Sequence, residues 1–271
     1  MLSVSHELSP RHGAQYTTQL QAGLGLVQET KALLEIWEPE YSTAALYQKA
    51  LESGRFPNVA ARRLRNVVVE CFAPRYLAAA GAPARALKRL VSALSTPELN
   101  QLFLLHTCRA NPILRDFVRQ VYWERYAAGH THVTNEDARR FVERSVDDQL
   151  TSKRWAESTV RRVSAYLSGC CADYGLLESG TRSNRRILPF RIMPNVVAYV
   201  SHELHFSGLG DNAVVAHEDW GLFGLERSEV LEEFKRLSLK GIFIIQAAGD
   251  IVRIGWKFQD MKALCDVLAE S

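Results

Sequence analysis

The chain has 271 residues, of which 47% are hydrophobic and 23% charged, a balance typical of a globular protein rather than a disordered or fibrous one. No run of about 18 apolar residues occurs, and the polar first residues lack the apolar core of a signal peptide, so we expect neither a membrane span nor secretion. The five cysteines are scattered without a CxxC pair, which argues against a disulfide framework and a zinc ribbon and favours a cytoplasmic protein.

The net charge of +3 conceals two strongly basic segments. Lys49 to Leu90 contains nine Lys/Arg and two Glu, a net of +7, and Lys153 to Met193 contains eight Lys/Arg and three Asp/Glu, a net of +5. The remainder of the chain is therefore acidic, with a net charge of −9. Two basic segments in an acidic background favour local contact with an anion over a general role in solubility.

Residues 1–13 are expected to form a flexible tail, and residues 14–150 a helical domain. Apolar spacing, caps and the positions of Pro and Gly predict the helices of this domain. The first lies late in Tyr16–Trp37, where Leu33, Leu34 and Trp37 have helical apolar spacing. The others cover Thr43–Glu52 with Ser42 as N-cap, Val59–Phe72, Ala84–Leu94, Pro97–Cys108, Ile113–Ala127, and Glu136–Gln149 with Thr134 to Asp137 as its cap, and Gly129–Thr134 is expected to be a loop.

Two of these helices, Thr43–Glu52 and Val59–Phe72, are separated by a short turn that contains Gly54, an order typical of a helix-turn-helix. The second helix carries three arginines on its charged face, namely Arg62, Arg63 and Arg65. We interpret this face as a phosphate-binding surface. The structural alternative is a solvated face of an ordinary bundle helix.

Residues 151–206 are predicted to form a winged-helix-like domain. Ser158 is expected to cap a helix that ends near Tyr174, because Gly175 is a natural stop. Strands are expected at Leu176–Glu178 and Arg186–Ile192 around a turn at Gly180–Asn184, followed by a helix at Asn195–Phe206. A helix followed by a hairpin with a basic tip is the outline of a winged helix-turn-helix.

In a winged helix, one helix enters the major groove, and the hairpin contacts phosphate or the minor groove. Arginine forks suit phosphate oxygens and guanine edges, and hydroxyls at a helix start can donate to phosphate. The candidate nucleic-acid-binding residues are therefore Lys153, Arg154, Ser158, Thr159, Arg161 and Arg162 at the helix, and Arg182, Arg185 and Arg186 at the wing. The alternative is a winged fold that serves as a protein scaffold, with solvated arginines.

Residues 207–271 are predicted to form a second helix-plus-hairpin unit. Its helix is expected at Glu229–Leu239 with Ser228 as cap, its strands at Ile242–Gln246 and Ile251–Phe258, and a final helix at Gln259–Ala269. The first helix carries several glutamates, so this unit favours a protein partner or packing over DNA.

Three other motifs are too weak to predict chemistry. His202 to His205 reads HExH, one residue short of the HExxH metalloprotease motif, and we expect exposed polar residues on a helix. Gly23-Leu24-Gly25 is only a fragment of a dinucleotide fingerprint, and Cys170-Cys171 is expected to pack in a core. The sequence therefore predicts no catalytic residue, no metal and no cofactor.

Two stretches resemble the BrxA family, which is encoded in BREX phage-defence islands of bacteria. They are YTTQLQAGLGLVQETKALLEIW from Tyr16, with the helix-turn-helix through Arg62 and Arg65 that follows it, and RWAESTVRRVSAYLSGCCADYGLLE from Arg154. The positions that carry the resemblance are Tyr16, Gly23, Glu29, Thr30 and Leu33, and then Trp155, Ser158, Thr159, Arg162, Leu167, Asp173, Gly175 and Leu176. The resemblance covers residues 16–195 and implies a helix-rich, non-enzymatic anti-phage component that binds double-stranded DNA.

The sequence thus predicts a mainly α fold, with a helical N-terminal bundle that contains a helix-turn-helix, followed by winged-helix-like α+β units with short β-hairpins. The expected function is double-stranded DNA binding through phosphate contacts within a BREX defence system, with other BREX subunits as candidate partners. Two alternatives stay open, a winged-helix adaptor for another protein subunit and an RNA-binding helical bundle.

Overall fold

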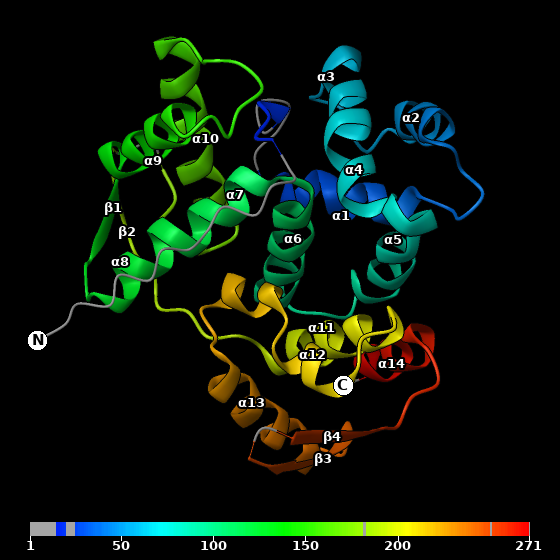
Figure 1. Cartoon of the computed structure of the whole chain (residues 1–271). Helices are drawn as coiled ribbons and strands as arrows, with labels where there is room; N and C mark the ends of the chain where they lie inside the picture. The colour runs from blue at the N-terminus through cyan, green and yellow to red at the C-terminus, as the bar shows by residue number, and fades with distance from the viewer. Residues whose placement is uncertain (1–14, 20–24, 181–182, 250, 271) are drawn as a thin grey trace, which may run out of the picture.

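The computed structural model describes residues 15–19, 25–180, 183–249 and 251–270, and most of these are helical (Figure 1). Within the described ranges, the strands form two small antiparallel sheets of two strands each. The prediction of a mainly α fold with short β-hairpins is therefore confirmed. The predicted tail at residues 1–13 and the Gly23-Leu24 pair lie outside the described residues.

The N-terminal half is a set of packed helices that ends in a long central one. They are α1 (Val27–Ile36), α2 (Thr43–Glu52), α3 (Ala61–Asn66), the π-helix η2 (Val67–Phe72), α4 (Ala73–Tyr76), α5 (Ala78–Leu90) and α6 (Thr96–Ala110). The cap predicted for α2 is present, since the Ser42 hydroxyl accepts a hydrogen bond from the Ala45 amide at 3.1 Å. Gly54 ends this helix region in the left-handed conformation (φ +68°).

The helical spacing predicted late in Tyr16–Trp37 is confirmed, since α1 begins at Val27 and buries Leu33 and Leu34. Leu26 adopts a left-handed conformation (φ 53°), and the Gly25 amide donates to Asp173 Oδ2 at 2.9 Å. The Gly25 amide therefore bonds to Asp173, whereas in a helix that extended further back it would donate to a backbone carbonyl of the preceding turn. Helix α5 starts earlier than predicted, with a break at Ala79–Gly81, where three residues have positive φ.

The middle of the chain contains an interrupted helix, a first strand, two further helices and a second strand. These are α7 (Pro112–Phe117), the π-helix η3 (Val118–Tyr122), α8 (Trp123–Ala127), β1 (His132–Thr134), α9 (Asn135–Asp147), α10 (Glu157–Asp173) and β2 (Asn184–Arg186). The Thr134 hydroxyl accepts from the Asp137 amide at 3.1 Å and so caps α9.

The first small sheet differs from the predicted hairpin. Strand β1, which was expected to be a loop, pairs with β2 in antiparallel register, with Val133 opposite Arg185. The strand predicted at Arg186–Ile192 is wrong, because regular pairing ends at the Leu177–Ile187 bridge and Pro189 has no amide to extend a ladder. Segment 176–178 lies on the other side of β2, where the Glu178 amide donates to the Arg186 carbonyl at 2.8 Å.

The C-terminal part has the predicted helix-plus-hairpin order. Its elements are α11 (Pro194–Phe206), α12 (Asp211–Val215), the 3-10 helix η4 (Glu218–Phe223), α13 (Arg227–Leu239), β3 (Phe243–Ala248), β4 (Ile251–Trp256) and α14 (Met261–Ala269). The predicted cap Ser228 is wrong, because α13 begins with a capping box formed by Glu226 and Glu229. Asp260 caps α14 by accepting from the Ala263 amide at 2.8 Å.

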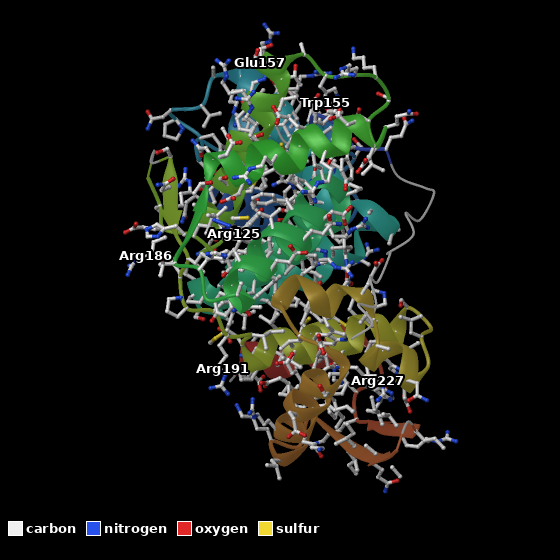
Figure 2. The ribbon with its side chains drawn as sticks, turned by 60° about the vertical axis from the view of Figure 1, so that its left-hand side comes forward. Arg125, Trp155, Glu157, Arg186, Arg191 and Arg227 are labelled. Carbon is white, nitrogen blue, oxygen red and sulfur yellow. The ribbon has the colours of Figure 1, made fainter. Side chains whose placement is uncertain are left out.

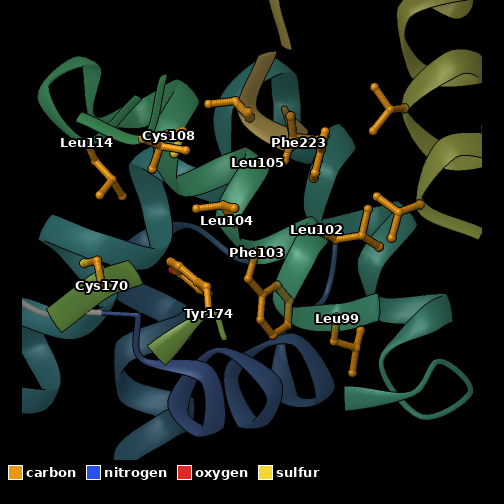
Figure 3. Close-up of a cluster of buried hydrophobic side chains, with 14 of the residues drawn as sticks. Leu99, Leu102, Phe103, Leu104, Leu105, Cys108, Leu114, Cys170, Tyr174 and Phe223 are labelled. Atoms are coloured by element: carbon orange, nitrogen blue, oxygen red, sulfur yellow. The ribbon is translucent and has the colours of Figure 1, made fainter. Parts of the chain in front are cut away.

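A continuous hydrophobic core runs through both halves and centres on α6 (Figure 3). From α6 it takes Leu99, Leu102, Phe103, Leu104, Leu105 and Cys108. Leu114, Cys170, Tyr174 and Phe223 reach it from other elements. The core therefore spans the boundaries at residues 150 and 206 that the sequence predicts, and these boundaries stay predictions. None of the helices in the described ranges has the length and apolar character needed to span a membrane.

Gly224 closes η4 with φ +69°, and a Cβ atom there would lie 2.6 Å from the Trp123 ring. That ring cannot easily retreat, since its Nε1 donates to the Leu222 carbonyl at 3.0 Å. We predict that Gly224→Ala lowers the free energy of unfolding by about 2–4 kcal/mol, of which about 1 kcal/mol comes from the left-handed backbone and the rest from overpacking.

Gly129→Ala is the matched control, because Gly129 has a similar φ of +73° but no atom within 4 Å of the added Cβ. The free energy of unfolding of Gly129→Ala should fall only by the backbone contribution of about 1 kcal/mol. Denaturant titration of both variants checks the prediction. Equal losses at the two sites would show that the Trp123 contact is not a constraint.

Candidate nucleic-acid interface

Helix α10 presents two different faces. Val160, Val163 and Leu167 are buried, and the helix packs along α9. The opposite face of its N-terminal half exposes Arg161, Arg162 and Ala165 to solvent. The apolar spacing of three and four residues places the buried side chains on one stripe, so the arginines between them must point outward. The C-terminal half of the same helix is buried almost all round.

The N-terminus of α10 lies at an outer end of the molecule, where Figure 2 shows Glu157 beside Trp155. Ser158 was predicted as the cap, but the N-cap residue is Ala156, and no side chain caps the first turn. Ser158 is instead the second helical residue and is exposed, while Thr159 is half-buried. The first amides of the helix therefore lack a side-chain acceptor.

The cations of this segment are exposed and weakly paired. Arg161 meets Glu157 at 3.2 Å and Arg154 meets Asp147 at 3.5 Å, in both cases with all side chains exposed. Such exposed pairs stabilise a fold by only about 0.2–1 kcal/mol, so a phosphate can readily replace the carboxylate. Lys153 and Arg162 are also exposed and have no ion pair within the described ranges.

At the predicted wing, successive side chains of β2 point to opposite faces. The Arg186 side chain is exposed (Figure 2), whereas Arg185 is half-buried and donates to the Glu178 carbonyl at 3.1 Å. Arg185 thus connects β2 to segment 176–178 through a side-chain hydrogen bond. Arg182 lies outside the described residues.

The second basic cluster is on α3, where Arg62, Arg63 and Arg65 are all exposed around the buried Leu64. Arg63 lines a cavity of about 460 Å³ together with Asp173 at the end of α10 and Ser179 at the start of the predicted wing. The cavity therefore lies between α3 and the α10 hairpin region.

The start of α1 connects the two basic clusters. The Gly25 amide donates to Asp173 Oδ2 at 2.9 Å, and the Tyr174 hydroxyl donates to the Gly25 carbonyl at 3.0 Å. In Figures 1 and 2, α3 and the N-terminus of α10 lie at the same end of the molecule. The two clusters thus belong to one side of the protein, a relation that the sequence could not give.

Most other cations between Lys49 and Leu90 have structural contacts. Lys88 Nζ lies 2.8 Å from a Glu38 carboxylate oxygen, Arg89 pairs with Asp266 at 2.8 Å, and Arg55 pairs with Glu35. Arg75 is buried in the core. The net charge of +7 in this segment therefore overstates the charge available to a ligand.

A charged cluster that the sequence did not predict joins α6, α11 and η4. Arg109 donates two bonds to Asp219 Oδ2, at 3.0 and 2.7 Å, and one to Glu203 Oε2 at 2.7 Å. Burial raises the pKa of Glu203, against the opposing effect of Arg109. Burial would also raise the pKa of Asp219, but hydrogen bonds with His217 and Arg109 outweigh it and hold the pKa at about 2.

The HExH motif does not converge on one point. His202 is fully buried, and its Nδ1 lies 2.8 Å from the Ala198 carbonyl, so the expected exposed histidine is wrong here. Burial lowers the pKa of His202 to about 4. Glu203 faces Arg109, and His205 stacks on Trp256 at 4.2 Å. Across the described residues, no group of three His, Cys, Asp or Glu side chains could hold a metal ion.

The adjacent cysteines are core residues, as predicted. Cys170 and Cys171 are both fully buried and form no disulfide. Burial raises the pKa of Cys170 to about 12, which keeps the thiol protonated and unreactive.

The comparisons with known proteins add a family to this geometry. The BrxA family model matches residues 14–203, which includes α3, α10 and the first sheet. Among solved structures, an uncharacterized protein from Magnetospirillum magneticum is 16% identical, with a TM-score of 0.56 over 71% of this chain and 95% of its own. At that identity the likeness shows the fold alone. No curated protein matches the chain.

The buried charges around Arg109 generate a stability prediction. Arg109→Leu leaves Glu203 and Asp219 without their cation, and we expect a loss of about 3–5 kcal/mol in the free energy of unfolding near neutral pH. Burial already raises the pKa of Glu203, and without the opposing cation this pKa rises further above its unfolded value. The loss should therefore be smaller near pH 5 than near pH 8, since that carboxyl can take up a proton.

Arg119→Leu is the control, because Arg119 pairs with Glu218 at 3.3 Å and both side chains are exposed or nearly so. It should cost less than about 1 kcal/mol, with little change across pH. Thermal or urea unfolding at several pH values measures both variants. A pH-independent loss in Arg109→Leu would contradict the assigned network.

Proposed function

This chain belongs to the BrxA family, and from that membership we propose that it is a BREX phage-defence component that binds double-stranded DNA without catalysing a reaction. The observation that carries the proposal is the order of elements around α10. A helix at 112–127 is followed by β1, α9 and α10, and then by the strand-like segment 176–178 and β2. Strand β2 pairs with β1 on one side and with segment 176–178 on the other.

This order supports a winged helix that begins at residue 112 rather than at 151. In such folds the last helix before the hairpin lies in the major groove, and the hairpin tip contacts the backbone. We therefore assign α10 as the recognition helix and the hairpin of segment 176–178 and β2 as the wing. Helix α9 packs along α10 and would form the first helix of the helix-turn-helix.

The exposed face of α10 has the chemistry that a duplex requires. Arg161 and Arg162 present guanidinium groups that can bind phosphate or a guanine edge. Ser158 adds a hydroxyl at the exposed helix start, and the small Ala165 lets the helix approach the groove closely. The weak Arg161–Glu157 pair would open at a cost of about 0.3–0.5 kcal/mol.

Flanking cations would hold the helix in the groove. Lys153 and Arg154 precede α10 in an exposed loop, and Arg186 is exposed on β2. Contacts from both flanks fix register on the duplex without reading its sequence. Binding would then rest mainly on phosphates and be largely independent of sequence.

The arginines of α3 would form a second contact to the same duplex. Arg62, Arg63 and Arg65 are exposed at the end of the molecule where α10 begins. The contacts of Gly25 with Asp173 and Tyr174 keep the start of α1 against the end of α10, and α3 borders the same cavity. A longer duplex would be needed to reach both clusters.

A protein adaptor is the second candidate, and one observation favours it. Residues 204–271, which the family model does not match, include α13, with exposed Glu229 and Glu232, and a hairpin with exposed isoleucines. An RNA-binding bundle is the third candidate. Gel-shift titration with duplex DNA, single-stranded DNA and RNA at two salt concentrations separates them. Absence of binding at low salt would favour the adaptor, and preference for RNA the bundle.

The double variant Arg161→Ala/Arg162→Ala tests α10. Loss of two phosphate contacts should weaken duplex binding by about tenfold for all sequences and reduce the slope of log K against log salt by about 1.8. The control is Lys235→Ala/Arg236→Ala, which removes the same charge from α13 at the other end of the molecule. Equal effects of the two variants would show that net charge alone drives binding.

The triple variant Arg62→Ala/Arg63→Ala/Arg65→Ala tests the second contact. We expect it to weaken binding to a duplex of about 30 bp and to have little effect on one of about 10 bp, a single helical turn. Fluorescence anisotropy with both duplexes measures the difference. The same loss on both lengths, or none on either, would contradict a shared surface that spans more than one turn.

A further inference from the structure

The β3–β4 sheet has one closed edge and one open edge. On β4, the amides of Val252 and Ile254 donate to the side chains of Asn212, at 3.1 Å, and Asp211, at 2.9 Å. These amides point away from β3 and are satisfied by α12. The start of α12 therefore closes the β4 edge against any further strand.

The register then fixes which backbone groups of β3 face outward. Ile245 lies opposite Ile254, and Ala247 lies opposite Val252. Since Val252 and Ile254 turn their amides away, these are the non-hydrogen-bonded pairs of the ladder. The amides and carbonyls of Phe243, Ile245 and Ala247 thus point away from β4. None of these three amides has a hydrogen-bond partner in the described part of the chain. Phe243 is buried, so the accessible part of this edge is formed by Ile245 and Ala247.

The open edge is also undefended. In Figures 1 and 2, β3 lies at the periphery of the molecule, opposite the end that carries α3 and the start of α10. Its sequence, FIIQAA, contains no charge and no proline, and its register with β4 shows no bulge. Ile244 and Ile251 beside it are 66% and 62% exposed. Proteins normally protect such edges, so an open one indicates a pairing site.

We propose that β3 pairs in antiparallel orientation with β3 of a second copy of this chain, about a twofold axis at Gln246. This register places Ile245 opposite Ala247 of the other copy and Gln246 opposite itself. The two accessible outward residues then fall at hydrogen-bonded pairs, which gives four backbone hydrogen bonds and a four-stranded sheet.

A second copy fits this edge better than a charged peptide would. The twofold operation pairs the strand with itself, and because FIIQAA is uncharged, no like charges meet across the axis. Ile244 of one copy comes to lie opposite Ala248 of the other, which covers part of its exposed surface. The basic clusters at the far end of each copy stay open, so a dimer would present two nucleic-acid surfaces that face away from each other.

Analytical ultracentrifugation of the full chain over a concentration series tests the dimer. We expect a monomer–dimer equilibrium in the wild type and at least a tenfold rise in the dimer dissociation constant in Ala247→Pro. The proline removes an outward amide and leaves the ladder to β4 intact. Ala247→Val is the control and should dimerise at least as well as the wild type. A wild type that is monomeric throughout, or a proline variant that dimerises equally, would overturn the proposal.

Disulfide trapping tests the register independently of that variant. Ile244→Cys and Ala248→Cys chains should cross-link when mixed, since the two positions face each other as a non-hydrogen-bonded pair with Cα atoms about 4.5 Å apart. Each variant alone should cross-link poorly, because like positions would lie four residues, about 13 Å, out of register. The five native cysteines are buried and do not compete. Cross-linking that is no greater in the mixture than in either variant alone would overturn this pairing.

Discussion

Helix α6 is buried on nearly every side, and the rest of the structure is arranged around it. Its side chains from Glu98 to Cys108 are nearly all buried, so elements from both halves of the chain are needed to cover it. Three of its buried polar side chains bond to different partners. Thr107 lies 2.7 Å from the Tyr174 hydroxyl, His106 Nε2 lies 3.0 Å from the Tyr199 hydroxyl, and Gln101 bonds to the 191–193 backbone. These bonds fix the positions at which α10 ends and α11 lies.

The position of the candidate interface follows from this arrangement. The C-terminal half of α10 is held in the core by Cys170, Cys171 and Tyr174, whereas its N-terminal half projects outward with Arg161 and Arg162. A rigid base with an exposed basic end suits a helix that must enter a groove without losing conformational entropy on binding. The Tyr174 hydroxyl also bonds to the Gly25 carbonyl, so the same anchor brings α1, and with it α3, to this side.

The elements that the sequence predicts correctly are those whose formation depends on residues close together in the chain. The caps at Ser42 and Thr134 and the helix-plus-hairpin order after residue 207 are confirmed, since each depends on neighbours in the chain. The sequence did not predict β1, because three residues are too short for an alternating pattern and their partner strand lies about 50 residues away. The sequence also did not predict the Arg109 cluster, because its carboxylates come from Glu203 and Asp219, about 100 residues away. Arg185 was predicted to bind a ligand, and in the structure its guanidinium donates to the Glu178 carbonyl.

Site-specific cross-linking from α10 to duplex DNA tests the central claim most directly. Ala165→Cys places a thiol on the exposed face of α10, and Leu239→Cys places one at the 90% exposed end of α13. Because the native cysteines are buried, a photoactivatable cross-linker attaches only at the new thiol. Our account predicts strong cross-linking to a duplex from position 165 and little from position 239. Equal yields, or a higher yield from position 239, would contradict the assignment of α10 as the DNA-facing helix.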